Sequence, residues 1–181
     1  DLIPTGAASY QAGVAGQAVN ITGAGLQRLR AGDSNDLDLA PNWTLEAFVK
    51  PDSNNTGEWD RFWTKWGDGG NYWHWTFRGS NNGLDLFING SDNVLNNNST
   101  ATVPPNVWSH VAVVGNQSEG TITAWLNGTQ VGSTSWQAIS ATAGAMSFGN
   151  FGSPADALQY SGLIDEAAIW SVALTPQQLA S

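Results

Sequence analysis

The sequence predicts an all-β domain in which two antiparallel sheets pack face to face. Segments with alternating side chains follow one another along the 181 residues, and Asn-Gly and Gly-rich turns separate them. The most apolar segment is a hairpin over residues 107–135, which is apolar on both faces. Such a hairpin needs a second sheet to cover it. We therefore predict a sandwich of about a dozen short strands.

The hairpin is the best defined of these segments. Its arms cover residues 107–115 and 121–131. Val111 and Val113 share one side of the first arm, because side chains alternate along an extended chain. The second arm ends at Asn127-Gly128, a pair that is preferred in tight β-turns whose two central residues adopt left-handed backbone. The sequence therefore predicts a tight turn at this pair.

Shorter strands are predicted on both sides of the hairpin. Residues 1–40 contain short strands, residues 42–50 form a longer one that Pro51 ends, and residues 162–170 form the last. One helical turn over residues 175–179 closes the domain, because Thr, Pro and Gln stand at the capping positions.

A clean alternation marks residues 72–78. Trp73, Trp75 and Phe77 fall on one face and are predicted to lie in the core, whereas His74 and Arg78 fall on the other. The following strand places Leu84, Leu86 and Ile88 in the core, with Asp85, Phe87 and Asn89 opposite. The second set is predicted to face solvent or a groove.

Composition excludes several classes of partner. Fifteen acidic residues against six Lys and Arg give a formal net charge of −9, which would repel nucleic acid and anionic membranes. No apolar run approaches the about 20 residues of a membrane span. The chain contains no cysteine, so disulfides and thiolate metal sites are excluded. The acid-rich, lysine-poor composition favours an extracellular or surface-displayed protein, whether secreted, on a cell or on a virion.

Five separate blocks carry a family resemblance. They are Trp108–Val113, Thr121–Gly128, Phe148–Asn150, Ser161–Trp170 and Ala173–Thr175, and their order and spacing resemble the laminin-G-like, concanavalin A-like jelly-roll family. The resemblance covers most of the chain and implies a jelly-roll β-sandwich. From the length and the lack of a linker-like segment, we expect residues 1–181 to form a single domain. The resemblance implies less about function, since the family includes sugar binders, adhesins, structural modules and relatives of glycosidases.

The residues do not support catalysis. Jelly-roll glycosidases place two carboxylates across the sugar bond with a Glu-x-Asp-x-x-Glu run, which this sequence lacks. Asp165 and Glu166 are neighbours and point to opposite faces of a regular strand. His74 and His110 accompany no nucleophile motif. We therefore predict that the chain is not an enzyme.

Asp165 is the candidate metal ligand. On a regular strand it shares a face with Leu163 and Ile169, so we expect it to be partly buried, and a buried carboxylate must be paired, hydrogen-bonded or bound to a metal. The resemblance implies one structural calcium at this position. Alternatively, Asp165 accepts backbone N–H groups from the loop around Gly23–Gly25, an interpretation favoured because Thr22 replaces the acidic ligand of the family.

Ten tryptophans are the strongest feature of the composition. Burial explains Trp73, Trp75, Trp108 and Trp125. Trp59 differs, because it stands in a polar loop. An exposed face with an aromatic ring, amides, a carboxylate and a guanidinium suits a sugar. The candidate ligand-binding residues are Trp59, Trp63, Tyr72, His74, Arg78, Asp85 and Asn89; the alternative is an ordinary solvated sheet face.

Two functions follow from these residues and the resemblance. The first is a non-catalytic module that binds a glycan or surface polysaccharide, or mediates adhesion. The second is a structural decoration or appendage domain on a virion or bacterial surface, whose partner is a protein in a larger assembly.

Overall fold

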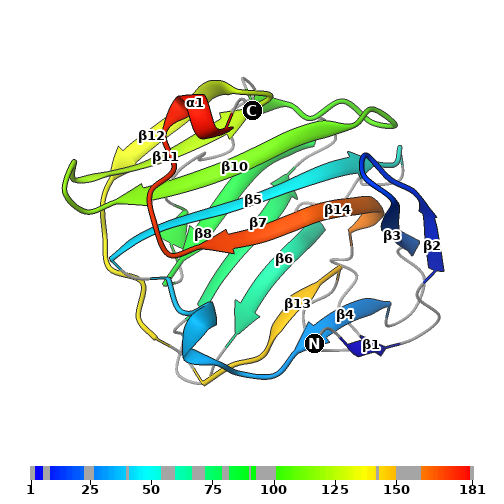
Figure 1. The fold of residues 1–181 in the computed structure, drawn as a ribbon, viewed down its shortest axis with the longest axis horizontal. Helices are drawn as coiled ribbons and strands as arrows, with labels where there is room; N and C mark the ends of the chain where they lie inside the picture. Colours follow the sequence, from blue (N-terminus) through cyan, green and yellow to red (C-terminus); the bar gives the residue numbers. More distant parts are fainter. Residues whose placement is uncertain are drawn as a thin grey trace.

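Two antiparallel sheets pack face to face in the computed structural model (Figure 1), which describes residues 3–5, 9–22, 27–39, 41–53, 60–66, 72–78, 82–89, 91–92, 101–141, 143–149 and 160–179. Within these residues each sheet has seven strands. The predicted all-β sandwich is confirmed. No helix in the described part of the chain has the length and apolarity needed to cross a membrane.

The first sheet joins strands from both halves of the chain. In spatial order it contains β1 (Ile3–Thr5), β4 (Arg28–Ala31), β13 (Met146–Phe148), β6 (Asp60–Trp66), β7 (Tyr72–Arg78), β8 (Gly83–Ile88) and β9 (Ser91–Asp92). A short 3-10 helix, η1 (Asn35–Leu37), lies between β4 and β5 in the chain.

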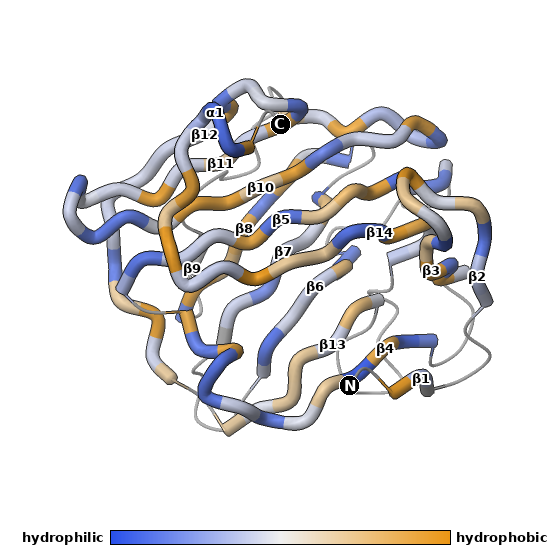
Figure 2. The backbone as a smooth tube through the Cα atoms, viewed as in Figure 1, coloured by the Kyte–Doolittle hydropathy of each residue, from blue (hydrophilic) through white to orange (hydrophobic). Residues whose placement is uncertain are grey.

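The second sheet contains the predicted hairpin and the last strand. Its spatial order is β12 (Thr129–Ser135), β11 (Thr121–Leu126), β10 (Ser109–Asn116), β5 (Asn42–Pro51), β14 (Ser161–Trp170), β3 (Gln17–Thr22) and β2 (Ser9–Ala12). Figure 2 shows hydrophobic residues along β10. The predicted turn is confirmed, because Asn127 and Gly128 have φ angles of 49° and 74°.

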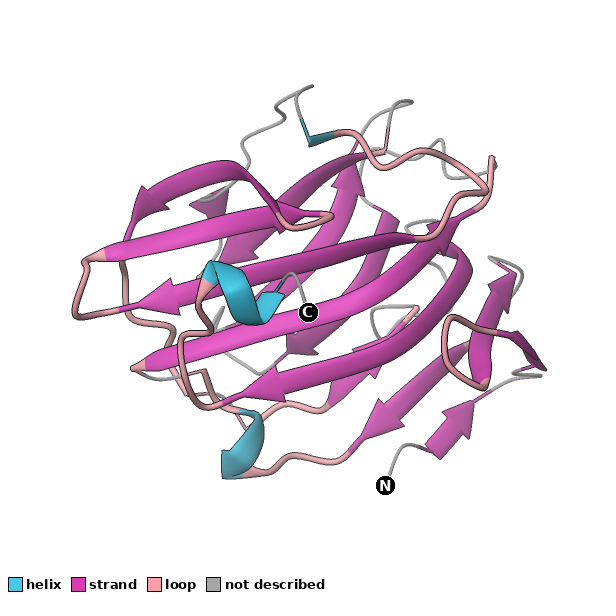
Figure 3. Cartoon of the chain, turned by 45° about the horizontal axis from the view of Figure 1, so that its top comes forward, coloured by secondary structure: helices cyan, strands magenta, loops and turns pink. Residues whose placement is uncertain are grey.

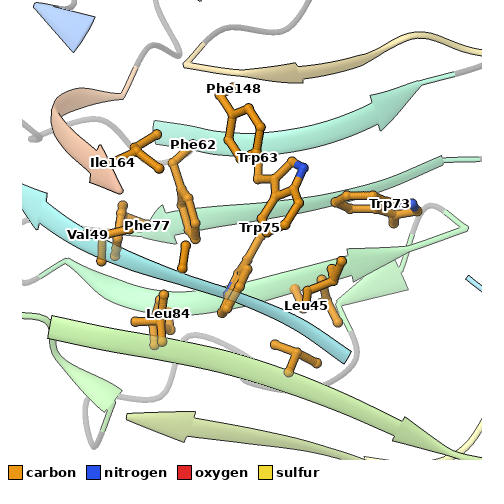
Figure 4. Packing of buried hydrophobic residues seen from close by; sticks show 14 of the residues in the cluster. Leu45, Val49, Phe62, Trp63, Trp73, Trp75, Phe77, Leu84, Phe148 and Ile164 are labelled. Atoms are coloured by element: carbon orange, nitrogen blue, oxygen red, sulfur yellow. The ribbon is translucent and has the colours of Figure 1, made fainter. Parts of the chain in front are cut away.

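Aromatic rings fill the space between the sheets (Figure 4). Trp73, Trp75 and Phe77 are at most 1% exposed, as their alternation predicts. The register of β6 against β7 shifts between Arg61 and Trp63, and this bulge lets both Phe62 and Trp63 face the core. Each buried ring stabilises the fold by about 1.5–3 kcal/mol through removal of apolar area from water.

A smaller apolar cluster lies on the outer face of the second sheet. Helix α1 (Pro176–Leu179) lies across this face (Figure 3), and Leu179 packs with Ala112 and Val114. The predicted capping box is confirmed, since Gln178 Oε1 accepts the Thr175 backbone N–H at 2.8 Å. Trp125 packs against this outer cluster while half-buried, and Trp108 is also half-buried; neither belongs to the core between the sheets, where they were predicted.

A bulge in β14 changes which residues of the last strand face the core, compared with the prediction. Asp165 pairs with Phe48 and Ala168 pairs with Glu46, so β14 takes three steps where β5 takes two. Ile169 therefore packs against the core, while Asp165 stands opposite the outward-facing Phe48. The prediction that Asp165 and Ile169 share a face is wrong because it assumed unbroken alternation.

Candidate functional site

A groove of about 720 Å³ lies on the outer face of the second sheet. Its floor comes from β5, β10 and β14, and α1 forms one wall. We call it the Trp170 groove; the residues used below to describe it are Glu46, Phe48, His110, Asn127, Glu166 and Trp170, with Gln178 and Leu179 on the helix side.

Glu46 holds two rings in this groove. Its Oε1 accepts the indole N–H of Trp170 at 2.7 Å, and its Oε2 lies 3.2 Å from His110 Nε2. Because a carboxylate accepts hydrogen bonds, the His110 tautomer that fits carries its proton on Nε2. The His110 ring also lies 5.0 Å from the Phe48 ring, centroid to centroid. One carboxylate therefore sets the positions of two aromatic side chains.

Trp170 is exposed although its indole nitrogen is bonded. It retains 44% of its accessible surface. Its position on the outer face follows from the register beyond the bulge, where it pairs with Thr44. A fixed and open indole ring is a flat apolar surface that needs little ordering when a ligand binds.

The turn and the bulge supply polar groups at the rim. Asn127 Oδ1 accepts the backbone N–H of His110 at 2.8 Å, which ties the β11–β12 turn to β10. Glu166 lies in the β14 bulge with φ of 46° and is exposed. Left-handed backbone is unfavourable for a residue other than glycine, and strained positions of this kind cluster at binding sites.

The sequence predicted a different site, on the first sheet. Strands β6, β7 and β8 are adjacent, as that prediction required. Trp63, however, is 1% exposed and packs edge-on against Trp73, with Phe148 on its other neighbouring strand. Its expected position on an exposed face is wrong, because the β6 bulge turns Trp63 inward.

His74, Arg78 and Asp85 do share the outer face of this sheet. The His74 ring stacks on Phe87 at 4.4 Å, and Arg78 Nη1 lies 2.9 Å from Asp85 Oδ2. His74 is only 3% exposed and Asp85 is fully buried, so their expected exposure is wrong. Burial, with a smaller effect of the Arg61 charge, lowers the pKa of His74 from 6.5 to about 3.

The remaining members of the predicted set have different outcomes. Asn89 is exposed and its Nδ2 donates to the Ala138 carbonyl at 2.9 Å. Trp59 lies outside the described residues, and only the backbone of Tyr72 is described, in β7. A binding role for this set stays a prediction.

Asp165 is buried, as predicted, with 7% exposure. Its Oδ2 accepts the backbone N–H of Ala15 and its Oδ1 accepts that of Glu166, both at 3.0 Å. Gly13 lies so close that an added Cβ would stand 2.2 Å from Oδ2. The backbone donor from the opening region is thus Ala15; the predicted loop at Gly23–Gly25 lies outside the described residues.

The fit of a calcium ion at Asp165 is poor. Both carboxylate oxygens accept N–H groups, and the described residues contain no cluster of three metal-ligating His, Asp or Glu side chains. Calcium prefers six to eight oxygen ligands. The residues around Asp165 therefore do not fit a calcium site, and calcium binding stays an untested prediction.

Sequence reasoning missed the residues of the Trp170 groove. A signal existed, because Glu46 and Phe48 alternate with core residues of β5 and must face outward. The sequence does not indicate which strands lie beside β5 in the sheet. Only the pairing of β5 with β10 and β14 brings His110 and Trp170 to Glu46.

Comparison with known proteins identifies the family. The model described as the concanavalin A-like lectin/glucanases superfamily matches residues 24–180, and the chain belongs to this family. The comparison with curated proteins gave no match. The family assignment confirms the resemblance read from the five sequence blocks.

Solved structures share the fold at low sequence identity. Domain 4 of AbnA, a GH43 extracellular arabinanase from Geobacillus stearothermophilus, in complex with arabinotriose, is 22% identical, with a TM-score of 0.76 over 97% of this chain and 81% of that one. A heptameric SAP-like pentraxin from Limulus polyphemus is 18% identical, with a TM-score of 0.63 over 90% and 79%. The botulinum neurotoxin serotype D binding domain is 14% identical, with a TM-score of 0.72 over 99% of this chain and 45% of that one.

Proposed function

We propose that the chain is a non-catalytic glycan-binding module and that the Trp170 groove is its binding site. The observation that carries this proposal is an indole ring that is 44% exposed and yet fixed by a hydrogen bond to Glu46. The C–H face of a sugar stacks on such a ring, and the hydroxyl groups of the sugar bond to the surrounding polar groups.

The polar groups of the groove suit recognition better than hydrolysis. Both oxygens of Glu46 accept hydrogen bonds from the rings that they position. A glycosidase needs one carboxyl group as proton donor and a second as nucleophile or base. We therefore propose that Glu46 is a positioning residue and that the module does not cleave its ligand.

The structural neighbours support a binding role by analogy of fold. The arabinanase domain is in complex with arabinotriose, and the toxin domain is described as a binding domain. We place the module outside the cell or on a cell or virion surface, in keeping with its acid-rich composition. Adhesion through a surface polysaccharide is the corresponding biological role.

A glycan array with point variants tests the proposal. The wild-type protein is expected to bind at least one plant, algal or bacterial glycan, and Trp170→Ala is expected to weaken that binding at least about tenfold, or about 1.4 kcal/mol. Trp66→Ala is the matched control, because Trp66 is 38% exposed on β6 of the other sheet. Thermal melting of each variant checks that it folds.

Two results would contradict the proposal. If no glycan binds, the module is instead a display domain with a protein partner. If Trp59→Ala or Tyr72→Ala abolishes binding and Trp170→Ala does not, the site lies on the first sheet, where the sequence predicted it.

A further inference from the structure

We infer that the Trp170 groove accepts neutral and amino sugars and rejects acidic ones such as uronates and sulfated sugars. This inference rests on the proposed glycan-binding function and names the class of its ligand. It follows from which charged groups line the groove, how Glu46 is held, and how two basic residues of the chain are paired. Lys50 lies on β5 with Glu46 and Phe48 but is not among the described lining residues.

The charged lining of the groove is acidic. Glu46 and Glu166 line it, and the described lining residues include no lysine or arginine. A bound carboxylate or sulfate is normally held by the guanidinium of arginine or the ammonium of lysine. An acidic sugar on Trp170 would meet carboxylates in place of these donors.

The Glu46 carboxylate and the Glu166 backbone are held at the groove. Glu46 is fixed at both oxygens by Trp170 and His110, so the rings that would support a sugar also hold a carboxylate beside it. The backbone of Glu166 is anchored because its N–H donates to Asp165 Oδ1 at 3.0 Å. Moving the Glu46 carboxylate away from an acidic ligand would break the hydrogen bond that fixes Trp170.

Two of the basic residues are already neutralised elsewhere. Lys65 is fully buried and forms ion pairs with Asp33 and Asp38, and Arg78 pairs with the buried Asp85. Both basic residues belong to the first sheet, away from the groove. The net charge of −9 adds long-range repulsion of acidic polysaccharides.

The test is an array that presents each backbone in neutral, 2-amino and uronate forms. In the β-1,4-linked gluco series these forms are cellotetraose, tetraglucosamine and tetraglucuronate, and a galacto series is built in the same way. The best ligand is expected among the neutral or amino forms. Its uronate counterpart is expected to bind at least about tenfold more weakly, the size of effect that one unfavourable charge contact near a protein surface produces.

A charge-reversal variant tests the cause. Glu166→Lys is expected to reduce the preference for the neutral form over the uronate form several-fold, while Glu166→Gln reduces it less. A uronate form that binds as well as its neutral counterpart would overturn the inference, as would an unchanged preference in Glu166→Lys. Absence of binding to every form would instead overturn the proposed glycan-binding function.

Discussion

The outer faces of the two sheets carry similar side chains but differ in access to solvent. On the first sheet the His74 ring stacks on Phe87, and on the second the His110 ring packs on Phe48. The His74 residue is 3% exposed, whereas the His110 side chain is 13% exposed and lines a groove. Alternation therefore identifies which residues leave the core, but not whether another part of the protein covers them.

Partial coverage creates the groove on the second sheet. Leu179 of α1 packs on Ala112 and Val114, so the helix shields the part of the face around β10 and β11. The neighbouring part, where Glu46 and Trp170 lie, stays open beside the helix. A helical turn of four residues thus provides both a cover for apolar side chains and a wall for the site.

The largest expected effect is a difference in stability loss between a core tryptophan, Trp75, and a groove tryptophan, Trp170. Trp75→Ala is expected to lower the free energy of unfolding by about 3–5 kcal/mol, because Trp75 is fully buried and its loss leaves a cavity. Trp170→Ala is expected to cost less than about 1 kcal/mol, since the residue is 44% exposed in the folded protein and its indole forms one hydrogen bond. Urea unfolding of both variants measures the difference. Equal losses would contradict the distinction between core and groove.

A second prediction concerns the pH dependence of stability that follows from the burial of His74 on the outer face of the first sheet. The pKa of His74 is about 3 in the folded protein and 6.5 in the unfolded chain. Below pH 6.5 the unfolded state therefore binds a proton that the folded state excludes. The contribution of neutral His74 to stability is complete above pH 6.5 and is lost progressively as the pH falls toward 3.

The measurement compares wild type with His74→Gln. From pH 7 to pH 5 the wild type is expected to lose about 2 kcal/mol more than the variant, because each pH unit below 6.5 costs about 1.4 kcal/mol. Urea unfolding at several pH values gives this difference. A difference that does not change with pH would show that His74 has solvent access and that the first face is open.

The smallest expected effect lies at the rim of the groove. Glu166→Gly is expected to raise the free energy of unfolding by up to about 1 kcal/mol, because glycine adopts a φ of 46° without the steric cost of a Cβ. Glu166→Ala is the matched control, since it removes the carboxylate but keeps the Cβ. Equal stability of the two variants, measured by thermal melting, would contradict a strained bulge.

The sequence predicts much of the sandwich but not the open site. The alternation of Trp73, Trp75 and Phe77 and the Asn127-Gly128 turn are local signals, and the structure confirms them. The inward turn of Trp63 and the outer position of Asp165 depend on bulges, which one extra residue creates without a clear local signal. The groove depends on strand order, which brings together residues more than a hundred positions apart, such as Glu46 and Trp170.

The bulge in β14 has a consequence for how the protein can diversify. Because Asp165 and Ala168 keep their pairing with β5 on either side, deletion of one intervening residue would restore an even ladder and leave the interior unchanged. Insertions at the same point would lengthen the bulge of β14 at the edge of the Trp170 groove. A change of length at this point would therefore reshape the groove without a change in the core packing of the sandwich.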